Sequence, residues 1–84
     1  MNRAEVYALI DTERARQRQL WEASHRWGKG DCSSPDVPSP IKAVVLAEES
    51  GEVARAVLEL NDAALRTELV QVAAVAVAWL EGMA

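Results

Sequence analysis

The segment LVQVAAVAVAWL, residues 69 to 80, constrains the fold of this chain more than any other part of it. Its only polar side chain is Gln71. A helix that is apolar on nearly all sides must be buried on most of them. Because a chain of 84 residues buries only a modest fraction of its surface, three helices of this length cannot cover such a helix alone. The segment therefore predicts a helical protein that completes its core by oligomerisation.

The rest of the chain also reads as helix, without an alternating strand pattern or an internal repeat. We predict helices over residues 3–26, 40–60 and 63–81, separated by a loop at 28–39 that is dense in Gly, Ser, Asp and Pro. The predicted fold class is all-α: one domain over residues 1–84, a bundle of three helices per chain, completed as a homodimer or homotetramer.

The helix boundaries follow from capping residues. Ser39 before Pro40 predicts the start of the second helix, because serine accepts a free backbone N–H and proline suits the first helical position. Between the second and third helices, Asn61 is expected to adopt the left-handed conformation that ends a helix, and Asp62 is expected to cap the next one.

Charge and composition exclude several classes of function. The net charge of −4 has the wrong sign for a protein that wraps nucleic acid, so DNA is not an expected partner. The N-terminus lacks a signal-peptide pattern, and the 12-residue apolar run is shorter than the roughly 20 residues that span a bilayer. Cys32 is the only cysteine, so no intrachain disulfide can form. We therefore expect a cytoplasmic protein with no membrane partner.

The stretch LAEESGEV places three acids, Glu48, Glu49 and Glu52, in a mostly small or apolar segment. At about 100° per residue from Ile41, all three fall within the apolar stripe of the second helix, opposite the side that carries Lys42. Buried like charges repel one another and lose hydration, so such a cluster needs a cation or shared protons.

The third helix carries a second polar pair, Glu68 and Gln71, one turn apart. In adjacent antiparallel helices this pair would oppose Glu49 and Glu52, and oxygen ligands of this type suit Mg²⁺ or Mn²⁺. The residues alone leave an alternative open, in which the acids are neutralised by arginines or shared protons; the arginines are Arg55 and Arg66.

These motifs resemble a known family. Glu48-Glu49-x-x-Glu52 followed by Glu68-x-x-Gln71 is similar to the EExxE…ExxD signature of the MazG-like nucleoside triphosphate pyrophosphohydrolases, members of the all-α NTP pyrophosphatase superfamily. The segments EESGEVARAVLE and LRTELVQVAAVAVAWLE, with an upstream ERARQRQLW…RWG, extend the resemblance over roughly residues 13 to 82.

The resemblance implies metal-dependent hydrolysis of a nucleoside triphosphate to its monophosphate and pyrophosphate. It implies that Mg²⁺ is bound by Glu49, Glu52, Glu68 and Gln71, and that Glu48 acts on the attacking water. Gln71 departs from the family pattern, because an amide oxygen can ligate Mg²⁺ but carries no charge. This departure supports an alternative function: a weakened or inactive helical module that binds nucleotide or oligomerises without turnover.

Several other residues are candidates for contacts with substrate. Their common feature is a polar or aromatic side chain near the expected site, and they are Glu13, Gln17, Trp27, Lys29 and Lys42. Trp21 is expected in the core and His25 at the surface or in a cap. Arg14, Arg16 and Arg18 form a basic cluster, read either as a solvated helix surface or as a patch for a small anion.

Overall fold

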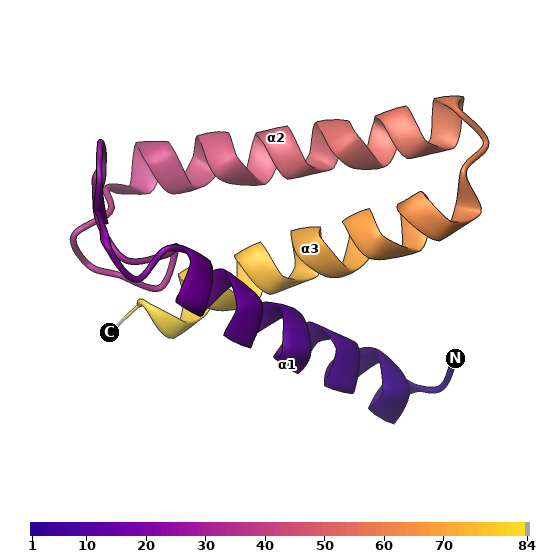
Figure 1. The fold of residues 1–84 in the computed structure, drawn as a ribbon, viewed down its shortest axis with the longest axis horizontal. Helices are drawn as coiled ribbons and strands as arrows, with labels where there is room; N and C mark the ends of the chain where they lie inside the picture. Colours follow the sequence, from indigo (N-terminus) through magenta and orange to yellow (C-terminus); the bar gives the residue numbers. More distant parts are fainter. Residues whose placement is uncertain (84) are drawn as a thin grey trace.

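The computed structural model describes residues 1–83 and contains three helices and a short hairpin (Figure 1). The helices are α1 (Arg3–Leu20), α2 (Ser39–Leu58) and α3 (Asp62–Glu81). Between α1 and α2, the two-residue strands β1 (Ser24–His25) and β2 (Gly28–Lys29) pair antiparallel. The predicted all-α class is confirmed.

Helix α3 is the centre of the fold (Figure 1). α2 runs antiparallel to it along one side and α1 crosses its other side, while α1 and α2 do not pack directly against each other. The apolar side chains that are well buried are small, and they are Val37, Ala56, Ala74, Val75 and Ala78. Small side chains let the helices approach closely, but no large side chain among residues 1–83 is fully enclosed. The core of one chain is therefore slight.

Helix α1 ends at Leu20, six residues earlier than predicted. The ring of His25 holds a hairpin there instead: its Nδ1 accepts from the Trp27 N–H at 3.2 Å, and its Nε2 donates to the Gly30 carbonyl at 2.7 Å. Gly28, with φ of +134°, supplies a backbone conformation that other residues rarely adopt. The prediction of a helix without strands was wrong in this segment, because these local hydrogen bonds replace those of the helix.

The turn between α2 and α3 lies one residue earlier than predicted. Leu60, with φ of 53°, takes the left-handed position that was expected of Asn61. Asn61 instead caps α3, because its Oδ1 accepts from the Ala64 N–H at 3.0 Å. Asp62, expected as the cap, is the first residue of the helix.

The start of α2 also differs in detail from the prediction. The helix begins at Ser39, with Pro38 at the N-cap, and no side chain makes a capping hydrogen bond there. Pro40 occupies the second helical position, where its missing N–H costs nothing.

Helix α3 is long and apolar enough to cross a membrane, with 20 residues and a mean hydropathy of 1.4, and no other helix within residues 1–83 is. The uninterrupted apolar run of residues 69 to 80 covers only part of this helix. Length and composition do not distinguish a spanning helix from the central helix of a bundle. In this structure α3 lies between α1 and α2 and carries Glu68 and Gln71 at its middle.

Candidate functional site

Three polar side chains meet where α2 faces α3. The Gln71 amide lies 2.8 Å from Glu68 Oε2 and 3.1 Å from Glu49 Oε2. Because ionised carboxylate oxygens only accept hydrogen bonds, we assign the Nε2 end of the amide to this side, where it donates to both. The antiparallel pairing of α2 and α3 thus brings together Glu49, Glu68 and Gln71, three of the four residues proposed as metal ligands.

We call the four glutamates around the Gln71 amide the acidic cluster, and they are Glu48, Glu49, Glu52 and Glu68. This cluster is strongly negative. Burial raises the pKa of Glu49, and the charges of four neighbouring acids raise it further; these are Glu68, Glu48, Glu13 and Glu52. Within residues 1–83, neither Arg55 nor Arg66 forms an ion pair with any of them. Part of the negative charge is instead compensated by the Gln71 amide and by Arg16 on α1. Arg55 and Arg66, which the sequence suggested for this role, do not take part.

Helix α1 adds a polar seam to the cluster. Glu13 and Gln17 are both buried, as their place on the apolar stripe predicts, and Gln17 Nε2 donates to Glu13 Oε2 at 3.1 Å. Arg16 donates two hydrogen bonds of 2.7 Å to the same carboxylate and lowers the pKa of Glu13. Glu49 in turn helps to raise the pKa of Arg16, which places this arginine within electrostatic reach of the cluster. No pattern in the sequence indicates this role for Arg16.

The donor set is suited to a hard cation, but it is not preformed. No three His, Cys, Asp or Glu side chains within residues 1–83 are close enough together to hold a metal ion. The 2.8 and 3.1 Å spacings around the Gln71 amide are nonetheless close to the roughly 2.9 Å that separates adjacent ligands of octahedral Mg²⁺. A cation at this point requires the amide to present its oxygen instead of its nitrogen.

The face of α2 that is turned toward α3 is rotated slightly from the predicted one. Lys42 and Ala56 are buried and Glu49 is half-buried between them, so the seam runs along positions seven residues apart. Lys42 was expected on the opposite side, and Glu48 was expected within the stripe but is exposed. Both expectations were wrong, because they took Ile41 as the centre of the buried face of the helix. The buried face is centred one residue further on, at Lys42. Glu52 is half-buried and contributes to the charge around Glu49.

The hairpin carries two of the remaining candidates, Trp27 and Lys29, both of which are exposed. None of their hydrogen bonds reaches the acidic cluster. Trp21, which follows α1, is 45% exposed and lies edge-to-face with the ring of His25, so the prediction that it belongs to the core was wrong. The shortened α1 is the reason, because Trp21 no longer continues the buried stripe.

The basic cluster of α1 is mostly neutralised within the chain. Arg14 is buried and donates two 3.0 Å hydrogen bonds to Glu81 and one of 2.8 Å to Asp31. Although burial opposes it, hydrogen bonds from Ser33 and Arg14 lower the pKa of Asp31. With Arg16 bound to Glu13, two of the three arginines have acidic partners, which argues against a patch for a small anion. No local signal could have found Glu81, which lies 67 positions from Arg14.

The fold and the cluster together define an all-α domain with carboxylates and an amide facing one another between two helices. No family model, no curated protein and no solved structure matches the chain.

Proposed function

We propose that this protein is a metal-dependent hydrolase that converts nucleoside triphosphates to monophosphate and pyrophosphate, like the MazG-like enzymes that its motifs resemble. The observation that carries the proposal is the convergence of Glu49, Glu68 and Gln71, with Glu52 beside them, between α2 and α3. Half-buried carboxylates that repel one another destabilise a fold, so a purely structural bundle gains nothing from them.

The proposed roles follow the chemistry of each group. Mg²⁺, or Mn²⁺, would be held by Glu49, Glu52 and Glu68 with the Gln71 side-chain oxygen, and the ion would neutralise the phosphates. Glu48 is exposed beside these residues, so its carboxylate can hold and deprotonate a water molecule from solvent.

Other residues would contact the nucleotide. Glu13 and Gln17 border the cluster from α1, and Lys42 lies two turns before Glu49 on the same face of α2, where its cation can attract phosphate. Trp27 and Lys29 would meet the outer part of the substrate from the hairpin. The enzyme would work in the cytoplasm, without DNA or a membrane as partner.

A second candidate is favoured by the bridge itself. Because the Gln71 amide satisfies both carboxylates without a cation, the chain is also suited to be a helical nucleotide-binding or oligomerisation module without turnover. The two candidates differ in whether added metal displaces the amide.

The experiment is calorimetric titration with Mg²⁺ and Mn²⁺ alongside pyrophosphate release from a panel of nucleoside triphosphates. Gln71→Asp is expected to raise metal affinity and to keep or raise turnover, because it restores a charged ligand. Glu68→Gln is expected to abolish turnover, as is Glu52→Gln. Glu48→Gln is expected to spare metal binding and lower turnover.

A matched control is Glu59→Gln, since this acid is exposed at the end of α2 and outside the cluster. Turnover in the wild type that is lost in the cluster variants and kept in the control supports the hydrolase. If none of the cluster variants alters metal binding or turnover, the hydrolase proposal is refuted. A wild type that neither binds metal nor releases pyrophosphate supports the helical module without turnover.

A further inference from the structure

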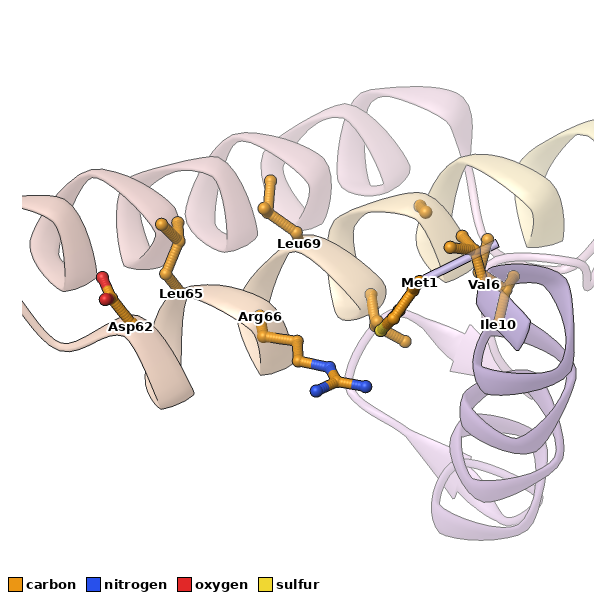
Figure 2. Close-up of a pocket in the computed structure, with 9 residues that line it drawn as sticks. Met1, Val6, Ile10, Asp62, Leu65, Arg66 and Leu69 are labelled. Carbon is orange, nitrogen blue, oxygen red and sulfur yellow. The ribbon is translucent and has the colours of Figure 1, made fainter. Parts of the chain in front are cut away.

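An apolar groove opens between α1 and α3, where the two helices diverge (Figure 2). It encloses about 350 Å³ and shares no residue with the acidic cluster. Side chains from the start of the chain and from α1 face α3 across the groove. The apolar lining consists of Met1, Val6, Ile10, Leu65, Leu69, Val70 and Ala73. Leu69 is 51% exposed, although it lies at the middle of the central helix. The groove is thus an incomplete part of the core.

The exposed area of the chain indicates how much surface is left to cover. One chain exposes 5842 Å². A compact monomer of 9.2 kDa exposes about 4,900 Å² by the usual scaling with mass. The excess of about 900 Å² is close to the roughly 800 Å² that each partner buries in a stable protein–protein interface.

The charges at the groove select among possible occupants. The lining contains one acid and one base, Asp62 and Arg66, one turn apart on α3. A lipid bilayer would leave both in hydrocarbon at high cost. A second copy brought in by a two-fold axis presents the same two charges in reverse order, so that Asp62 of each copy can pair with Arg66 of the other.

We propose that a second copy of this chain covers the groove between α1 and α3, forming a two-fold dimer in which the first half of α3 is buried. This interface supplies the apolar burial that α1 and α2 leave undone on α3. It is independent of the proposed catalysis, because none of its residues belongs to the acidic cluster.

The test is sedimentation velocity on the full chain, with circular dichroism to verify the fold of each variant. The wild type is expected to be a dimer at micromolar concentration. Leu69→Glu places a charge in the groove and is expected to raise the dimer dissociation constant at least tenfold. Val44→Glu is the matched control, since Val44 is 61% exposed on α2 and does not line the groove. A monomeric wild type, or equal dissociation constants for the two variants, would overturn the proposal.

A charge swap keeps the proposal testable if Leu69→Glu does not fold. Asp62→Arg alone is expected to weaken the dimer by like-charge repulsion, and adding Arg66→Asp is expected to restore it. Failure of the second change to restore the dimer would overturn the pairing. Flotation with phosphatidylcholine vesicles provides the last outcome, because a monomer that floats with the vesicles would assign the groove to lipid and overturn the dimer.

Discussion

Replacing Gln71 by glutamate tests what its amide does between two carboxylates. The change keeps the size of the side chain but removes two hydrogen bonds to charged acceptors, at 2.8 and 3.1 Å. Each would contribute about 1.5–3 kcal/mol if it were fully buried, and solvent screening of this half-exposed cluster reduces that to about 1 kcal/mol each. The third carboxylate adds repulsion of about 1 kcal/mol even at the dielectric constant of water. We therefore expect Gln71→Glu to lower the free energy of unfolding by about 3 kcal/mol at pH 7.5 without metal.

The pH dependence has a definite sign. The new charge raises the pKa of Glu49 further above its unfolded value of 4.5. A carboxyl group whose pKa is higher in the folded state contributes stability that is present below the unfolded pKa and is lost as pH rises through the folded pKa. The difference between variant and wild type should therefore shrink as pH falls toward 4.5, and millimolar Mg²⁺ at pH 7.5 should reduce it by neutralising the acids.

The assay is a thermal melt followed by circular dichroism, in EDTA and then in Mg²⁺. Gln19→Glu serves as the control, because it adds one negative charge at an exposed position of α1. For a chain of this length, about 3 kcal/mol corresponds to a fall in Tm of roughly 15 °C. If Gln71→Glu melts no lower than Gln19→Glu at pH 7.5, the amide bridge does not hold α2 to α3.

Three further changes test other parts of the structure. Arg14→Met should cost about 3 kcal/mol in urea unfolding, because it leaves the buried carboxylate of Asp31 without its cation; an unchanged unfolding midpoint would refute this. Glu49→Gln should stabilise the metal-free protein at pH 7, with the gain disappearing near pH 4.5, since it removes a group whose pKa folding raises. Urea curves at both pH values measure that gain, and destabilisation at pH 7 would contradict it. Gly28→Ala should cost about 1–3 kcal/mol and loosen the hairpin, because φ is +134° and the new Cβ would lie 2.8 Å from a backbone carbonyl oxygen; hydrogen exchange that is unchanged in the hairpin would count against this.

Much of the fold could be predicted because the information is local. The apolar periodicity of residues 63–81 and 40–60 fixes two helices within one or two residues of their observed ends. A short turn then forces these helices to be antiparallel, which is why Glu49, Glu68 and Gln71 meet as the spacing predicts. Their positions follow from helical geometry alone.

The remaining features depend on contacts between residues far apart in the chain. Arg14 is buried only because Asp31 and Glu81 converge on it, and nothing in the residues near Arg14 specifies either partner. The sequence by itself determined an all-α chain with acids facing each other across two helices. The tertiary structure decided that Lys42 lies on the buried face and that the Gln71 amide lies within hydrogen-bond distance of both carboxylates. The reason is that helix periodicity sets which side chains share a face, whereas packing sets the rotation of each helix by the few tens of degrees that separate a buried residue from an exposed one.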